Sequence, residues 1–207
     1  MLNSKRTQML CVSAVMVALA TVLSFLKVWE MPFGGSVTLF SMVPLVFLSY
    51  KYGVKWGVFS AGAFSLIQML FGISSLGNDL VTVIGSCILD YIVAYTVIGL
   101  SGMYRNRIKN VTLSMVLGFL TATLIRYAVH VISGYIFFRS YAEWYFGQDG
   151  IPFGAFILEH VSGNALSILY AFAYNLFLLP DTVIDVVGLI VLSVAAKRYL
   201  TPERTAS

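Results

Sequence analysis

The stretch MLCVSAVMVALATVLSFL, residues 9–26, contains no charged side chain and is long enough to cross a lipid bilayer as one helix. An α-helix rises about 1.5 Å per residue, so about 20 apolar residues span the ~30 Å of hydrocarbon in a membrane. Lys5 and Arg6 precede the stretch, as they would in a secretory signal, but it is long for a signal core and no small-residue cleavage site follows it. The stretch therefore predicts a retained first transmembrane helix.

The composition of the whole chain agrees with this beginning. Of its 207 residues, 59% are hydrophobic and only 11% are charged, whereas roughly 25% of the residues in a soluble domain are charged. We therefore expect residues 1–207 to form a single multi-pass domain of the cell (plasma) membrane, with the lipid bilayer as its surroundings. No part of the sequence is left over for a soluble domain.

Further apolar segments follow the first one. They are Val37–Tyr50, Trp56–Leu76, Leu80–Met103, Val111–Phe138 and a last span within Asp181–Leu200. Each is near or above the length that a crossing needs, except the second, which Pro44 also interrupts. That segment could cross only by recruiting residues 34–36 or by lying inside the bundle, where irregular backbone is tolerated. The pattern predicts an all-α integral membrane fold with six transmembrane helices.

The basic residues indicate how this fold is oriented. Ten of the thirteen lie before the first span, in alternate connections, or at the end of the last span: Lys5, Arg6, Lys51, Lys55, Arg105, Arg107, Lys109, Lys197, Arg198 and Arg204. Six crossings place all ten on one side, which the positive-inside rule identifies as the cytoplasm. Both termini are therefore predicted to be cytoplasmic. The net charge of +4 then reflects topology, and no nucleic-acid partner is expected.

The segment Phe156–Leu179 does not fit the six-span count. It is apolar enough to cross, but a seventh crossing would place the basic end of the last span outside. Pro180 predicts a break in the helix, with Asp181 as the N-cap of the last span. We expect residues 139–180 to form an outer loop and an extra outer-side helical segment before the last span. A long, kinked last helix that overshoots the membrane is the alternative.

Three ionisable residues, Asp90, Arg126 and His130, lie well inside predicted spans. Such groups usually face the interior of a bundle or a cavity. The helical rise places Asp90 about 15 Å and His130 about 12 Å below the outer ends of their spans, and therefore at a similar level. Two interpretations are open. Asp90 and Arg126 form a buried structural pair, with His130 bonded to a backbone carbonyl, or Asp90 is the counter-ion for a cationic solute in a pocket open to the outside.

Motifs for several enzyme classes are absent from the sequence. There is no GxxxxGK[ST] nucleotide loop and no GxSxG nucleophile elbow. The two histidines lack the spacing of a metal site, so no metal or cofactor is expected. A stand-alone membrane enzyme that uses His130, Glu159 and His160 is a less favoured alternative, and a purely structural membrane subunit is another. In the first span, Ala14 and Ala18 would allow another helix to approach closely, which predicts a partner protein there.

Four motifs, in order along nearly the whole chain, resemble the thiamine-specific substrate-binding (S) components of energy-coupling-factor (ECF) transporters. They are MPFGGSVT at 31–38, LDYIVA at 89–94, RYAVHVISG at 126–134 with IFF at 136–138, and Tyr170 with Tyr174 and Asn175 before Pro180. The resemblance implies high-affinity binding of thiamine from the outside and its delivery into the cell. It also implies a shared transmembrane coupling subunit and two ATPase subunits as partners, so that this chain is not itself an enzyme. An S component for another vitamin or pyrimidine is the nearest alternative.

The resemblance also assigns residues to the ligand. The substrate-binding set is Asp90, Tyr91, His130, Phe138, Tyr170 and Asn175. Asp90 would accept hydrogen bonds from the aminopyrimidine and offset the thiazolium charge, while Asn175 would both donate to and accept from the pyrimidine edge. Phe138, Tyr170 and His130 would sandwich the rings. Some members of the family carry glutamate in place of Asp90 and tryptophan in place of Phe138.

Two further regions take a role from the resemblance. Ala14 and Ala18 would dock on the coupling subunit. Residues 27–38 would form a lid-like loop over the pocket, with its gate residues at Trp29, Glu30, Gly34, Gly35 and Ser36. The Gly-Gly pair would allow this loop two conformations.

Overall fold

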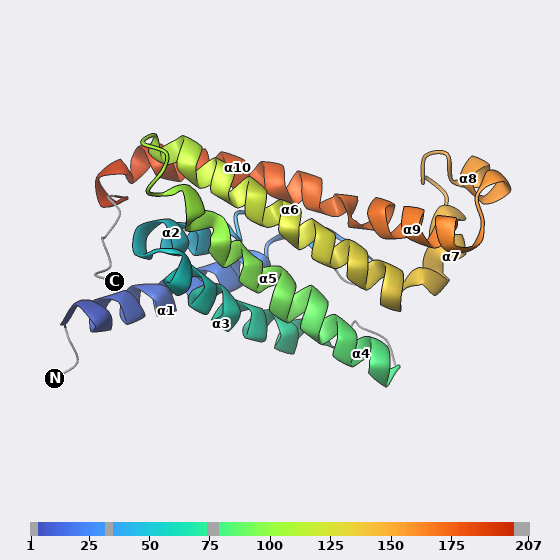
Figure 1. The fold of residues 1–207 in the computed structure, drawn as a ribbon, viewed down its shortest axis with the longest axis horizontal. Helices are drawn as coiled ribbons and strands as arrows, with labels where there is room; N and C mark the ends of the chain where they lie inside the picture. Colours follow the sequence, from blue (N-terminus) through green and yellow to red (C-terminus); the bar gives the residue numbers. More distant parts are fainter. Residues whose placement is uncertain (1–3, 32–34, 74–78, 201–207) are drawn as a thin grey trace.

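The computed structural model describes residues 4–31, 35–73 and 79–200, which form an elongated bundle of helices (Figure 1). The bundle begins with α1 (Ser4–Ser24), α2 (Val43–Tyr52) and α3 (Val54–Gly72). One long helical run follows, composed of α4 (Leu80–Ser86), the π-helical η2 (Cys87–Val93), α5 (Ala94–Thr96) and the 3-10 segment η3 (Val97–Tyr104). Next come α6 (Val111–Phe137), η4 (Arg139–Tyr141), α7 (Ala142–Phe146) and α8 (Gly154–His160). The chain closes with α9 (Gly163–Tyr174), η5 (Asn175–Phe177), α10 (Leu178–Ala195) and η6 (Lys197–Tyr199).

Among the described residues, five helical runs are long and apolar enough to cross a membrane. They are Lys5–Ser24, Val54–Gly72, Leu80–Tyr104, Val111–Phe137 and Gly163–Ala195. The predicted second span is represented by α2, which has ten residues, too few to cross alone. Every residue of α2 except Lys51 is buried, so α2 lies inside the bundle, as one of the two expectations for this segment required. The six crossings of the sequence analysis stay a prediction.

The outer surface of the bundle suits a lipid environment. Large apolar side chains on four different helices point outward, and Val15, Leu70, Leu124 and Val194 are each more than 60% exposed. Extended apolar surfaces of this kind are unfavourable in water and are found where a protein meets another protein or a membrane. The protein is therefore an integral membrane protein.

The basic connections gather at one end of the molecule. In Figure 1 the start of α1, the α2–α3 and η3–α6 connections and the end of α10 all lie at the same end, and α7 and α8 lie at the other. Arg105 Nη1 donates to the backbone carbonyl of Lys51 at 3.2 Å, which joins two of these connections directly. The connections that carry the basic residues thus lie at one end of the molecule, as the predicted orientation requires. That this end faces the cytoplasm remains a prediction.

The predicted break before the last span is wrong. The helical run from Gly163 to Ala195 is continuous over 33 residues, about 50 Å, and contains only the short 3-10 segment η5. Pro180 lies in the first turn of α10, directly after the 3-10 segment η5, and the first turn is the part of a helix that tolerates proline best. Asp181 is not an N-cap but a buried side chain inside α10. A long last helix that overshoots the membrane, the alternative expectation, describes the structure better than a separate outer-side helix.

The fold is also not purely helical. Strands β1 (Lys27–Glu30) and β2 (Ser36–Thr38) form an antiparallel hairpin within the predicted lid-like loop. Lys27 Nζ and Glu30 Oε1 make an exposed ion pair at 2.6 Å on β1. The strands are too short for an alternating pattern to be recognised in the sequence, which explains why no sheet was predicted.

Side-chain caps and close packing define the ends and the core of the long helices. Asp79 caps α4 by accepting from the Thr82 backbone N–H at 2.8 Å, and this hydrogen bond lowers the pKa of Asp79. The main core joins α2, α3, η3 and α6 around Tyr50, Phe64 and Phe119. At Gly99 a Cβ atom would lie 2.3 Å from the backbone nitrogen of Val58, so only glycine permits this approach of η3 to α3.

Candidate ligand-binding site

A cavity lies between η2, α6 and the α9–η5 segment. It measures about 650 Å³ with its open mouth included. All six residues of the predicted substrate-binding set line it: Asp90, Tyr91, His130, Phe138, Tyr170 and Asn175. Six residues outside that set line it as well: Gly35, Tyr95, Arg126, Gly134, Tyr174 and Phe177. The structure therefore brings together side chains that are up to 87 positions apart in the sequence, the separation of Asp90 and Phe177.

Asp90 and His130 face each other, which their similar predicted depths allowed. Asp90 lies in the π-helical segment η2, and such segments often occur at functional sites. His130 Nδ1 lies 2.8 Å from Asp90 Oδ1, and Ser133 Oγ donates to Asp90 Oδ2 at 2.5 Å. An ionised carboxylate only accepts hydrogen bonds, so Nδ1 carries the proton. His130 Nε2 is buried and makes no hydrogen bond within the described part of the chain, which leaves it for a ligand.

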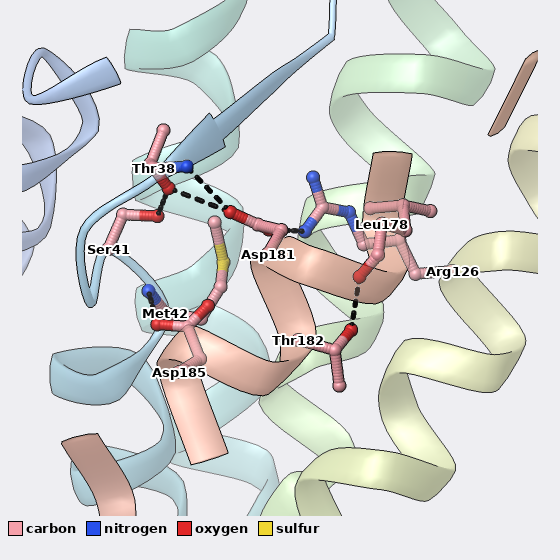
Figure 2. A network of polar contacts seen from close by, with 8 residues as sticks. All are labelled: Thr38, Ser41, Met42, Arg126, Leu178, Asp181, Thr182 and Asp185. Carbon is pink, nitrogen blue, oxygen red and sulfur yellow. Dashed lines mark hydrogen bonds and ion pairs between the residues drawn. The ribbon is translucent and has the colours of Figure 1, made fainter. Parts of the chain in front are cut away.

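The buried pair of Asp90 and Arg126, one of the two interpretations of the sequence, is not formed. Arg126 instead places Nη1 3.7 Å from Asp181 Oδ2, and its guanidinium carbon lies 4.6 Å from the centre of the Tyr95 ring. Figure 2 shows Arg126 and Asp181 facing each other. The side chains of both are 4% exposed. Asp181 offsets the charge of Arg126. The carboxylate of Asp90 is therefore not paired with Arg126 and remains in the cavity as a negative group.

The amide of Asn175 makes hydrogen bonds within the protein. Its Nδ2 donates to the backbone carbonyls of His130 at 3.2 Å and Ala171 at 2.8 Å. Both amide hydrogens are thereby used by the protein. Asn175 also lines the cavity, and the group that its amide can still offer a ligand there is the acceptor Oδ1.

Replacing Asn175 with aspartate is expected to lower the free energy of unfolding of the ligand-free protein by about 1–3 kcal/mol. The carboxylate would face the carbonyls of His130 and Ala171, two acceptors without a donor between them. Thermal unfolding of the purified protein would measure the change. Asn164→Asp on the exposed surface of α9 is the matched control and should leave stability unchanged. Equal stability of the two variants would contradict the assigned orientation of the amide.

Aromatic rings form the wall of the cavity on the side of α9. Tyr170 and Tyr174 lie with their ring centres 5.5 Å apart, and Tyr145 of α7 packs edge-on against both at 5.5 and 5.7 Å. Burial raises the pKa of Tyr145, so its hydroxyl stays neutral at physiological pH. Phe177 lies 6.4 Å from the His130 ring, centre to centre. Such rings can hold a flat ligand by stacking and a cationic ligand through their faces.

The predicted gate residues are only partly at the cavity. Gly35 lines it and has φ +86°, and a Cβ atom there would lie 2.7 Å from the Phe177 ring. Glu30 and Ser36 line an adjoining cavity of about 990 Å³, measured with its mouth. Trp29 is 64% exposed and is not among the residues that line either cavity. Gly34 lies outside the described residues.

The residues of the enzyme alternative are not brought together. His130 lines the cavity, whereas His160 is exposed on α8, where it stacks on Phe156 with ring centres 4.2 Å apart. Within residues 4–31, 35–73 and 79–200, no group of three His, Cys, Asp or Glu side chains could hold a metal ion. The geometry gives no support to a catalytic role for His130, Glu159 and His160.

The predicted docking residues lie on the outer face of α1. Ala14 and Ala18 are exposed, whereas Val17 and Ala20, on the opposite face of the helix, are buried against the core. The inner face is also held by a hydrogen bond of 2.6 Å from Trp56 Nε1 of α3 to Ser13 Oγ. Ala14 and Ala18 therefore remain accessible to another helix.

A helical membrane bundle that encloses a carboxylate, a histidine and several aromatic rings in one cavity defines a class: integral membrane proteins that bind a small, polar or cationic ligand. Comparison with known proteins identifies the family. The family described as thiamine transporter protein matches residues 10–149. The thiamine transporter ThiT of Bacillus subtilis (strain 168) is 30% identical over 214 residues, which cover 98% of each chain. This chain belongs to the thiamine transporter protein family, which confirms the resemblance found in its four motifs.

A solved structure supports the fold. The structure of ThiT from Listeria monocytogenes superimposes with a TM-score of 0.52 at 19% sequence identity, and the match covers 94% of this chain and 98% of the other. Family membership together with the apolar helices makes this a multi-pass protein of the cell membrane. Its family is one of transporters, not of enzymes.

Proposed function

We propose that this protein binds thiamine from the outside in the cavity beside Asp90 and delivers it into the cell as the S component of an ECF transporter. The observation that carries the proposal is the Asp90 carboxylate, held by His130 and Ser133 within an aromatic-lined cavity. Thiamine is a permanent cation with two aromatic rings, and a fixed carboxylate with nearby ring faces complements it in charge and in shape. Membership in the thiamine transporter protein family supports the same ligand.

The roles of the residues follow from their contacts. Asp90 offsets the thiazolium charge and accepts from the aminopyrimidine, and its hydrogen bonds to His130 and Ser133 keep it in place. Asn175 offers Oδ1 to the pyrimidine edge. Phe138 and Tyr170, which line the cavity from α6 and α9, enclose the rings, and Tyr91 completes the wall on η2. Tyr174 and Phe177 join this aromatic set.

The energy for transport comes from partner proteins. The sequence carries no nucleotide-binding loop of its own. The exposed pair Ala14 and Ala18 on α1 provides a surface on which a helix of a coupling subunit can pack closely in the membrane. Two ATPase subunits bound to that coupling subunit would then drive the release of thiamine to the inside.

Residues 27–38 act as the lid of the cavity in this proposal. Gly35 reaches the cavity itself, and Glu30 and Ser36 face the adjoining one, so part of this segment already borders the space that a ligand would occupy. Movement of this segment would control entry from the outside. Outer residues 139–180 supply Tyr145, Tyr170 and Tyr174 to the aromatic wall.

Titration calorimetry of the purified protein with thiamine tests the proposal. We expect saturable binding of one thiamine per chain, tighter than binding of an isolated pyrimidine or of another vitamin. Mass spectrometry of whatever copurifies provides an independent assignment. A different ligand that binds more tightly would establish an S component with another specificity, and the absence of any saturable ligand would favour a structural subunit.

A further inference from the structure

Asp181 joins two parts of the molecule that the proposed binding site does not itself connect. Its Oδ1 accepts from the Thr38 backbone N–H at 2.8 Å and from the Thr38 hydroxyl at 3.1 Å. Its Oδ2 lies 3.7 Å from Arg126 Nη1. Figure 2 shows Asp181 between these two residues, with Thr38 on β2 and Arg126 on α6. One buried carboxylate of α10 therefore contacts both the hairpin and a side chain that lines the cavity.

On the hairpin side, Thr38 is the last residue of β2. It pairs with Lys27 of β1 in the register of the hairpin, and its hydroxyl also lies 2.7 Å from Ser41 Oγ. Asp185, one helical turn after Asp181, accepts from the backbone N–H of Met42 at 3.2 Å. Met42 is the N-cap residue of α2, so Asp185 attaches the start of α2 to α10, whereas Asp181 attaches the end of the hairpin.

On the cavity side, Arg126 borders both the ligand cavity and the adjoining cavity beneath the hairpin. It lies one helical turn before His130, the residue that holds Asp90. Asp181 lines only the adjoining cavity, so it does not reach the proposed ligand. A buried guanidinium needs its counter-ion, because removing one partner of a buried pair leaves an uncompensated charge. Any change at Asp181 is therefore transmitted to Arg126 and to Thr38 together.

We propose that Asp181 is a positioning residue that determines how long the ligand stays bound: it fixes the base of the β1–β2 hairpin and Arg126 in one arrangement beside the cavity. This inference rests on the proposed thiamine binding. Asp181 and Asp90 then have different roles. Asp90 contacts the ligand and sets affinity through its charge, whereas Asp181 acts through Thr38 and Arg126. Its effect should therefore be on the rate of thiamine release rather than on the charge requirement of the ligand.

The dissociation rate of labelled thiamine, chased with an excess of unlabelled thiamine, tests this role. Asp181→Asn keeps an oxygen for Thr38 but removes the charge opposite Arg126, and we expect it to release thiamine about tenfold faster or more. Thr38→Val keeps the backbone hydrogen bond to Asp181 but removes the hydroxyl, which contacts both Asp181 and Ser41. It should therefore raise the release rate by about fivefold or more. Asp185→Asn, on the same helix and without an ion pair to Arg126, is the matched control and should stay within twofold of wild type.

The thermal unfolding of the ligand-free variants distinguishes this role from a purely structural one. Thr38→Val loses buried hydrogen bonds, so its unfolding temperature should fall below that of the wild type. A positioning role predicts that it releases thiamine faster even at temperatures at which the ligand-free variant is fully folded. Release at the wild-type rate from Thr38→Val and from folded Asp181→Asn would overturn the inference and leave the proposed function intact. Failure of the wild-type protein to retain thiamine at all would overturn the proposed function and this inference with it.

Discussion

Asp90→Asn is expected to weaken thiamine binding by about 10- to 150-fold, the equivalent of the 1.5–3 kcal/mol of a charged hydrogen bond. Asparagine has nearly the same shape but no charge. His130 Nδ1 and Ser133 Oγ both donate to the carboxylate of Asp90, so the amide group of asparagine would face at least one donor with its own NH₂. The substitution therefore removes the counter-ion of the thiazolium and disturbs the group that holds it.

Titration calorimetry on matched variants separates these two effects. Ser133→Ala removes one donor and keeps the charge, so it should cost less affinity than Asp90→Asn. Asp90→Glu retains the charge. We expect it to retain binding, because some members of the family carry glutamate at this position. Asp149→Asn, on an exposed outer loop, should bind thiamine as the wild type does. Unaltered affinity in Asp90→Asn would rule out the counter-ion role.

That Asp90 and His130 lie at a similar depth could be predicted, because the helical rise gives the depth of each residue in its span. Two residues at equal depth in two spans can meet whenever those spans are neighbours. The choice of partner for Arg126 could not be predicted in this way. Pro180 suggested a break in the helix, so Asp181 was expected at a helix end. From the sequence alone, a proline in the first turn of a helix looks the same as a proline that ends one.

The cavity residues that the sequence analysis missed follow a helical period. On α6 and its end, Arg126, His130, Gly134 and Phe138 are spaced by four and so share one face. Gly134 completes this series, and its missing side chain leaves room between α6 and α9. Extending the series from His130 and Phe138 would have identified Gly134 and included Arg126. The glycine was passed over because it has no functional group.

The same period applies on the opposite wall. Tyr170, Tyr174 and Phe177 are spaced by four and three residues, which is the spacing of one helix face. Tyr174 and Phe177 could therefore have been predicted from Tyr170, because all three lie within the helical segment expected at Phe156–Leu179. The hairpin contacts could not, because the bond from Thr38 to Asp181 spans 143 positions and no local pattern encodes it.

Leucine at both Ala14 and Ala18 is expected to reduce thiamine uptake by cells at least about tenfold while leaving thiamine affinity within about twofold of wild type. The two alanines are exposed on α1, and the opposite face of the helix is packed against the core through Val17 and Ala20. Lipid provides no hydrophobic drive for helix association, so helices in a membrane depend on small residues that allow close contact. Two isobutyl groups would hold a partner helix away without entering the ligand cavity.

Uptake of labelled thiamine by cells that carry the variant, set beside calorimetry of the same purified variant, measures both quantities. Ala128→Leu is the matched control, because Ala128 is also an exposed alanine on a long helix, but on α6. It should change neither uptake nor affinity. Persistent uptake in the Ala14 and Ala18 double variant would mean that α1 is not the docking face. Loss of affinity together with uptake would mean that the substitutions disturb the bundle, since the cavity lies on elements other than α1.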